Sequence, residues 1–150
     1  MTTKREAVLA GLTAHLEAAL KPELHELVVR RGGPMPEAIS DDGLVVIRDG
    51  TPELDAAPLG QIGPWYWSHI VPVEIVVRAG DDALRDRRFD TIVGAIGDAL
   101  DADTTLGGLI HGLDYSPPVE PEESPIDGAA GFKHGLIEVV LDYETPTRVA

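Results

Sequence analysis

The spacing of apolar residues near the N-terminus predicts one amphipathic helix. Over residues 3–20, leucine and valine recur every three or four positions, which places them on one face of a helix. Thr2 or Thr3 can cap its start, and Pro22 marks its end. The apolar face consists of Val8, Leu9, Leu12, Leu16 and Leu20. Such a face needs a sheet to cover it.

A second amphipathic helix of about 18 residues begins where Asp81 or Asp82 can cap it. Its packing stripe is predicted to be Leu84, Arg88, Phe89, Ile92, Val93, Ile96, Ala99 and Leu100. It runs into an unusual corner, "DADTTLGGL", at residues 101–109. Gly107 and Gly108 supply the left-handed backbone that ends helices or turns corners.

Alternation with a period of two predicts the strands. The clearest is "WYWSHIVPVEIVVR", residues 65–78, in which every second residue from Trp67 to Val77 faces the core. Ser68, Glu74 and Arg78 lie on its other face. Pro72 cannot donate to a ladder and implies a bulge or an exposed edge.

Shorter apolar runs predict the remaining strands at residues 24–31, 44–49, 109–115 and 132–144. For residues 24–31 a helix is an open alternative, because only Pro22 separates them from the first helix. In the last strand Ile137, Val139, Leu141 and Tyr143 are predicted to point inward. Residues 50–64 and 116–131 are predicted as long loops rich in proline, a kind that is usually functional or mobile.

The element order is therefore α-β-β-β-α-β-β. It predicts an α+β fold, with two main helices packed on one face of a mixed, mostly antiparallel sheet of four to five strands. Residues 1–150 are predicted to form a single domain. The other sheet face is half polar and suits solvent or a neighbouring molecule.

Charge and composition narrow the function classes. With 12 basic and 26 acidic residues the net charge is −14, which disfavours binding to nucleic acid. The absence of cysteine excludes disulfides and thiolate metal sites and suits a cytosolic protein. The N-terminus lacks the features of a signal peptide, and no apolar run is long enough to span a bilayer, so we expect no membrane association.

The sequence contains no recognisable catalytic motif. No two of the five histidines have the spacing of a helical metal site, and the glycine-rich turns are not phosphate loops. We therefore expect no catalytic residue, no cofactor and no metal, and histidines that are half-buried or on the surface. The alternative is a small enzyme or ligand-binding domain that uses His69 and residues 65–67.

Two groups of residues are candidates for a protein interface. Arg85, Arg87 and Arg88 open the second helix, where cations oppose the helix dipole, so acids on a neighbouring subunit could be their partners. The alternative, favoured for any single arginine, is an ordinary set of pairs within the helix. Trp65 and Tyr66 are either the edge of the core or exposed anchors of an interface.

The combination of several motifs resembles the phage tail terminator family. The motifs are "RFDTIVGAIGDALDADTTLGGL" after an edge strand, "LIEVVLDYET" closing the chain, "LVVIRDGTPE" and "WSHIVPVEIVV". The most specific piece is the corner at residues 103–108. These proteins, also called tail completion or minor tail U-like proteins, occur in siphophages, prophages and gene transfer agents.

The resemblance implies a structural protein without catalytic residues that forms a ring, expected to be a hexamer. The ring caps the completed tail tube, stops its polymerisation and presents a surface to the head–tail connector or neck protein. Assembly would take place in the host cytoplasm, and the protein would then sit at the head–tail junction of the particle. DNA would pass through an acidic lumen without specific binding. Another neck or head-completion protein of such a particle is the alternative.

The resemblance also gives the corner after the second helix a role. It would be a fixed bend that returns the chain to the sheet, with Leu106 buried and the glycines placed where a side chain would clash. Asp103 and Leu106 are accordingly added to the candidate interface with the subunit or the tail tube.

Overall fold

The computed structural model describes residues 2–60, 62–120 and 131–149 of the chain. Its helices and strands, in chain order, are α1 (Lys4–Leu20), β1 (Val28–Arg31), β2 (Leu44–Ile47), β3 (Thr51–Ala56), β4 (Trp65–Arg78), α2 (Asp82–Ala102), β5 (Gly112–Tyr115) and β6 (Phe132–Thr145). The predicted α+β class is confirmed, with one strand more than the sequence predicts.

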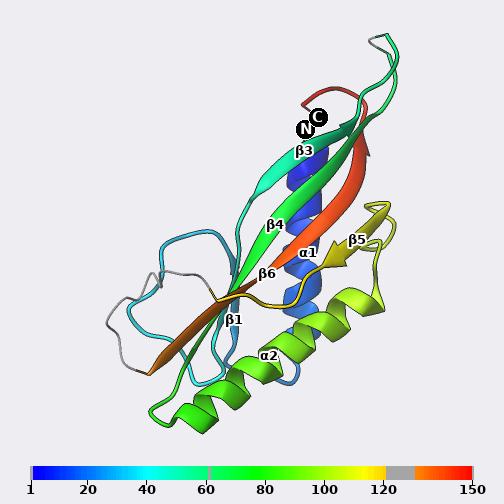
Figure 1. Ribbon diagram of the computed structural model, residues 1–150. Helices are drawn as coiled ribbons and strands as arrows, with labels where there is room; N and C mark the ends of the chain where they lie inside the picture. The colour runs from blue at the N-terminus through cyan, green and yellow to red at the C-terminus, as the bar shows by residue number, and fades with distance from the viewer. Residues whose placement is uncertain (1, 61, 121–130, 150) are drawn as a thin grey trace.

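The strands form a mixed sheet in the order β1-β2-β4-β6-β5, with β3 also paired to β4. β1 is parallel to β2 and all other pairs are antiparallel. β4 and β6 pair along their whole length, from Trp65 opposite Thr145 to Arg78 opposite Phe132. Figure 1 shows these two strands as the long ribbons that cross the molecule. Because they pair over their full length, these two strands connect the end of the sheet near β3 with the end near the start of α2.

The main core lies between one face of this sheet and both helices. Every second residue of β4 from His69 to Val77 is buried, as are Ile137, Val139, Leu141 and Tyr143 of β6. α1 contributes the five predicted residues, and α2 contributes Phe89, Ile92, Ile96, Ala99 and Leu100. Thr3 and Asp81 cap the two helices through their side chains. The predicted inward faces of α1, β4 and β6 are thus confirmed. Of the stripe predicted for α2, Leu84, Arg88 and Val93 are only half-buried.

Two predicted segments are wrong. Residues 51–56, predicted as part of a loop, form β3, which pairs with β4 from Thr51 opposite Ile70 to Ala56 opposite Tyr66. Its polar sequence carries no strand pattern, and the pairing with β4 alone makes it extended. Residues 24–27 are neither strand nor helix, because α1 ends at Leu20 and β1 begins at Val28.

The bulge that Pro72 predicts is present, but in the segment opposite β4. Three residues, 48–50, stand opposite two, 71–72, between the pairs Ile47–Val73 and Thr51–Ile70. Gly50 adopts a left-handed φ of 63° at this bulge. The carbonyl of Pro72 accepts the Arg48 N–H at 2.9 Å, so the missing N–H of Pro72 also faces the bulge.

The other sheet face is partly covered as well. Leu44, Val46 and Val76 form a small second cluster there, against Met35 and Ile39 of the connection between β1 and β2 and against Phe132. This connection supplies the crossover that two parallel neighbours require. The rest of the face mixes polar side chains, such as Ser68 and Asp142, with half-buried apolar ones, such as Ile70 and Val140. This agrees with the half-polar face that the sequence predicts.

Candidate functional site

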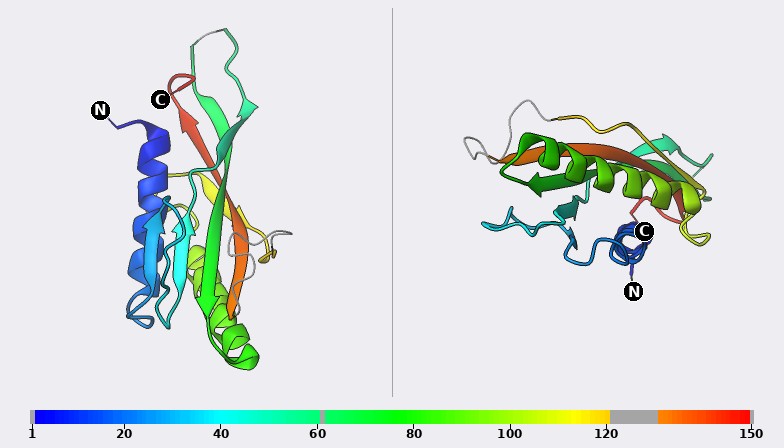
Figure 2. Two further views of the ribbon diagram at one scale, coloured as in Figure 1. Left: turned by 90° about the vertical axis from the view of Figure 1, so that its left-hand side faces the viewer. Right: turned by 90° about the horizontal axis from the view of Figure 1, so that it is seen from below.

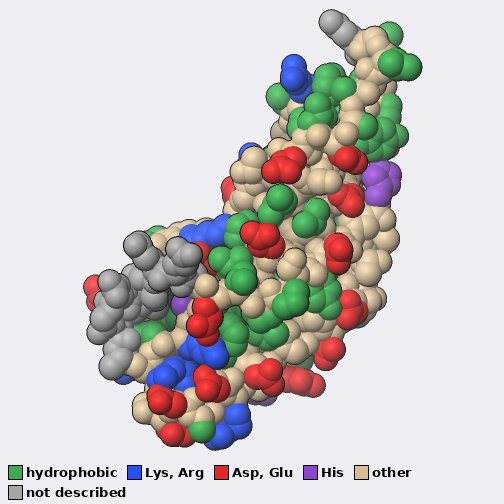
Figure 3. Space-filling model, in the orientation of Figure 1, with side chains coloured by type: hydrophobic (Ala, Val, Ile, Leu, Met, Phe, Trp, Pro, Cys, Tyr) green, Lys and Arg blue, Asp and Glu red, His purple; other side chains and the backbone are tan. Residues whose placement is uncertain are grey.

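The arginines at the start of α2 are largely engaged within the chain. Arg85 binds Asp82 at 2.7 Å, which is the pair within the helix that the sequence left open. Arg88 donates to the carbonyl of Arg78 at 2.6 Å and lies 3.8 Å from a carboxylate oxygen of Asp41. Figure 3 shows Lys and Arg side chains gathered with acids around this end of the molecule.

Arg87 differs from its two neighbours. It is exposed, and its side chain forms no hydrogen bond or ion pair with any residue that the structure describes. Of the three candidate arginines, it is the one whose guanidinium is most available to another molecule.

The corner after α2 is built around Asp103. Its carboxylate accepts the backbone N–H of Thr105 at 3.2 Å, the Thr105 hydroxyl at 3.2 Å and the backbone N–H of Gly107 at 2.8 Å. These bonds, the one from the Thr105 backbone first, lower the pKa of Asp103. Asp103, the C-cap residue of α2, thereby holds the turn that follows the helix.

The expected reasons for the rest of the corner need correction. Leu106 is half-buried against the core rather than fully buried, and it has a left-handed φ of 49°. A side chain at Gly107 or Gly108 would meet nothing within 4 Å. The two glycines are therefore required by their φ angles of 69° and 88°, not by a clash.

The aromatic candidates lie at the start of β4. Trp65 is half-buried under the guanidinium of Arg148, whose carbon lies 5.4 Å from the ring centre. Tyr66 is exposed, with its ring centre 6.2 Å from that of His111. Trp67 faces the core and donates from its indole nitrogen to the Thr145 hydroxyl at 2.8 Å.

The structure does not bring the candidates together. The arginines begin α2 and the Asp103 corner ends it, and the 21 residues of this helix span roughly 30 Å. Trp65 and Tyr66 lie near the projecting end of the β3–β4 hairpin, away from α2 (Figure 1). They are three separate surfaces rather than one site.

His69 is the centre of a buried polar chain. It is fully buried, and its Nε2 lies 2.6 Å from the carbonyl of Asp49 while its Nδ1 lies 2.9 Å from the Tyr143 hydroxyl. A carbonyl only accepts, so Nε2 carries the proton and Nδ1 accepts from Tyr143. Burial lowers the pKa of His69 and raises that of Tyr143. Both ring nitrogens are therefore occupied.

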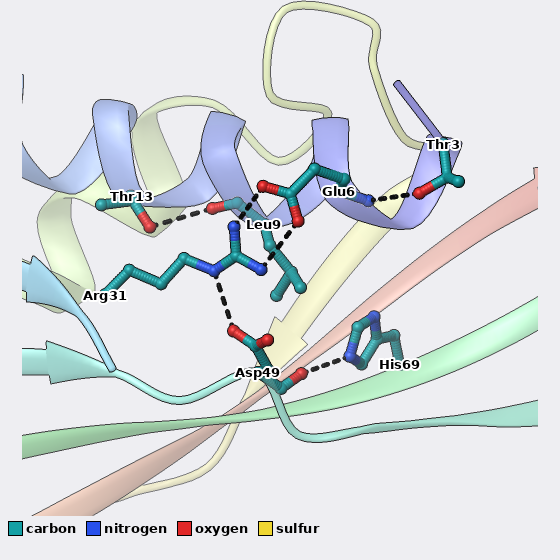
Figure 4. A network of polar contacts seen from close by, with 7 residues as sticks. All are labelled: Thr3, Glu6, Leu9, Thr13, Arg31, Asp49 and His69. Atoms are coloured by element: carbon teal, nitrogen blue, oxygen red, sulfur yellow. Dashed lines mark hydrogen bonds and ion pairs between the residues drawn. The ribbon is translucent and has the colours of Figure 1, made fainter. Parts of the chain in front are cut away.

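The polar chain continues to the surface through Arg31, a residue that the sequence analysis did not single out. Its Nε donates to Asp49 at 2.8 Å, and its two terminal nitrogens donate to both carboxylate oxygens of Glu6 at 2.5 and 2.9 Å. The hydrogen bonds from Arg31 lower the pKa values of Glu6 and Asp49. Figure 4 shows how this side chain joins α1, β1 and the bulge before β3.

Two of the other histidines, His15 and His134, also have contacts within the fold. His15 binds the carbonyl of Ala99 at 2.7 Å and so links α1 to α2. His134 is 8% exposed, lies 3.9 Å from a carboxylate oxygen of Glu74, and has a pKa lowered by burial. In the described residues, no three His, Asp or Glu side chains are grouped as a metal ion would require.

The most prominent surface feature is the β3–β4 hairpin, which projects beyond the body of the molecule (Figures 1 and 2). Near its tip, the side chains of Leu59 and Ile62 are 99% and 90% exposed. At its base lies a pocket of about 260 Å³, lined by Arg5, Pro52, Trp67, Tyr143, Thr145, Arg148 and Val149. No periodic pattern in the sequence indicates either feature.

None of the helices in the described parts of the chain has both the length and the apolar character to cross a bilayer.

Comparisons with known proteins give a likeness in fold. Neither the known protein families nor the curated proteins contain a match. Among solved structures, a chain of the "Virion of native gene transfer agent (GTA) particle" is similar, with a TM-score of 0.50 and 14% sequence identity. The likeness covers 91% of this chain and 92% of that one. It therefore concerns the whole fold rather than one motif.

Proposed function

We propose that this chain is a structural assembly protein of a phage-like particle, and that it acts there as the tail terminator. In this role copies form a ring, expected to be a hexamer, that caps the completed tail tube and stops its polymerisation. The ring then offers its other face to the head–tail connector or neck protein. Assembly takes place in the host cytoplasm and ends at the head–tail junction of the particle.

The observation that carries this proposal is the likeness in fold to a chain of a gene transfer agent virion over nine-tenths of both chains. The sequence resemblance to tail terminators, centred on residues 103–108, points in the same direction. The structure supports the corner as a built element, because the Asp103 carboxylate accepts three hydrogen bonds within it.

The surface suits assembly. A projecting hairpin with exposed apolar residues, and an Arg87 guanidinium that binds no group among the described residues, are features of a protein that binds other proteins. A net charge of −14 per copy makes a ring lumen repel the phosphates of DNA, which favours passage over adhesion. Arg85, Arg87, Arg88, Trp65, Tyr66, Asp103 and Leu106 remain the proposed contacts with a subunit or the tail tube.

Deleting the gene in the cell that encodes this chain tests the role. Without a terminator, tails are expected to grow beyond their normal length and to remain unattached to heads, as measured by negative-stain microscopy of lysates. Complementation with the wild-type gene is the control. Tails of normal length that fail to join heads would instead support the alternative, another neck or head-completion protein.

The enzyme alternative makes a different prediction. It relied on His69 and residues 65–67, yet His69 is fully buried with both ring nitrogens bonded, and Trp67 is bonded to Thr145. A His69→Gln variant is therefore expected to alter stability while complementing the deletion. A folded and assembled His69→Gln protein that fails to complement would revive this alternative.

A further inference from the structure

The β3–β4 hairpin carries an apolar tip that its own chain does not cover. Leu59 is 99% exposed and Ile62 is 90% exposed, so neither side chain contributes to the core. Large aliphatic side chains held this far from the body gain hydrophobic stabilisation only when another surface covers them. The hairpin arm behind the tip is a pair of hydrogen-bonded strands, which presents the tip at a defined distance.

A matching recess lies at the base of the same hairpin. Its apolar wall consists of Pro52, Trp67 and Val149, and its volume is about 260 Å³. This is smaller than the roughly 300–1,000 Å³ of pockets for drug-sized ligands, but it can accept one or two aliphatic side chains. The tip of the same chain does not fill it, since Leu59 and Ile62 are exposed.

The charges beside the two surfaces are complementary. β3 carries two exposed carboxylates, Glu53 and Asp55, on the arm that leads to the tip. Arg5 and Arg148 line the recess and are exposed. Among the described residues, none of these four side chains takes part in an ion pair, although Arg148 lies over the ring of Trp65. Two guanidiniums beside a recess are notable in a chain of net charge −14.

We infer that the hairpin tip of one copy docks into this recess of a second copy, with Leu59 and Ile62 entering it and the arm's carboxylates meeting Arg5 and Arg148. When each tip enters the recess of the next copy rather than being exchanged within a two-fold pair, the contact is head-to-tail and repeats around a ring if the rotation closes. This inference deepens the proposed function and rests on its ring.

The chain has no cysteine, so single cysteines can be placed without background. Leu59→Cys protein is mixed with Val149→Cys protein and oxidised, and disulfide-linked pairs are identified by mass spectrometry. Ala18→Cys replaces Val149→Cys in the control, because Ala18 is also exposed but lies on α1 outside the recess. The 59–149 pair is expected to exceed the 59–18 pair at least about tenfold, since docked thiols meet at millimolar effective concentration.

A second variant removes the apolar tip. Leu59→Asn combined with Ile62→Asn is expected to abolish assembly in light scattering while the melting temperature stays that of the wild type, because both side chains are exposed. Two outcomes would overturn the docking but not the ring. In the first, wild type forms rings while the 59–149 and 59–18 pairs cross-link equally. In the second, the double variant still forms rings. A wild type that remains monomeric at high concentration, with equal cross-linking, overturns both the docking and the ring.

Discussion

Replacing Gly50 by alanine is expected to destabilise the protein strongly, because two separate costs meet at this position. Gly50 has a φ of 63°, where a residue with a side chain is strained. A Cβ built there lies 1.9 Å from the carbonyl oxygen of Ile70 in β4. That oxygen belongs to the backbone of the longest strand pair in the sheet and cannot turn aside as a side chain would.

The size of each cost follows from the geometry. The left-handed conformation costs an alanine about 1–2 kcal/mol, and the reduced freedom of the unfolded chain returns about 0.4–1 kcal/mol. A normal contact between carbon and a carbonyl oxygen is about 3.3–3.6 Å, so the bulge and β4 must separate by roughly 1.5 Å. Overpacking of this kind costs about 1–3 kcal/mol more. We expect a total of about 1–4.5 kcal/mol for Gly50→Ala.

Gly107→Ala is the matched control. Gly107 has nearly the same φ, 69°, but a Cβ there would meet nothing within 4 Å. It should show the conformational cost alone, about 0–1.5 kcal/mol. Urea denaturation of wild type and both variants measures the difference, provided that the slope of the transition is unchanged. Equal losses of stability in the two variants would refute the assignment of a backbone contact at Gly50.

Three further changes test other parts of the molecule. Arg31→Met should lower the free energy of unfolding at pH 7, and lower it less below about pH 4. Arg31 lowers the pKa values of Glu6 and Asp49, and the stability that their ionised carboxylates add is lost as pH falls through those values. Urea denaturation at several pH values measures this, and a difference between the two proteins that does not change with pH would contradict it. His69→Gln should reduce the loss of stability that wild type shows as pH falls below about 6.5. Burial lowers the pKa of His69, so in wild type only the unfolded protein takes up a proton on this ring in that range. Thermal melts at several pH values test this, and the same slope of stability against pH in both proteins would contradict it. Arg87→Glu changes an exposed side chain, so its free energy of unfolding should stay within about 0.5 kcal/mol of that of wild type. Its assembly, measured by light scattering at low salt, should be weaker. Assembly as strong as that of wild type would remove Arg87 from the interface.

The parts of the fold that the sequence predicts well are those in which burial imposes a period. Residues 65–78 form one strand because apolar side chains alternate along them. The helices begin directly after Thr3 and Asp81 because the side chains of these two residues cap them. β3 escapes prediction because its residues are mostly exposed on both faces. It is held by hydrogen bonds to β4, and backbone pairing leaves no pattern in the side chains.

Whether a candidate arginine is available for an interface is hard to predict from sequence for a related reason. The arginines cluster in sequence, but in the fold Arg85 and Arg88 are bound by groups of their own chain, Asp82 and the carbonyl of Arg78. Arg85 pairs within its own helix, as the sequence allowed, but the group that binds Arg88 belongs to β4. Local sequence does not reveal a partner that comes from another element. The Arg31 clamp is the clearest case, because its two carboxylates lie 25 and 18 residues away.

The distribution of charge limits where copies can approach one another. Each copy carries −14, so two copies repel at long range unless salt screens them, and stable contact needs short-range attraction that exceeds this repulsion. Arg31 and Arg48 cannot supply it, because each already binds a carboxylate of its own chain. The recess combines an apolar wall with Arg5 and Arg148, which form no ion pair with any residue that the structure describes. There a second copy can bury aliphatic side chains while its carboxylates meet Arg5 and Arg148. At this place the electrostatic interaction between the copies is attractive, and it adds to the hydrophobic stabilisation.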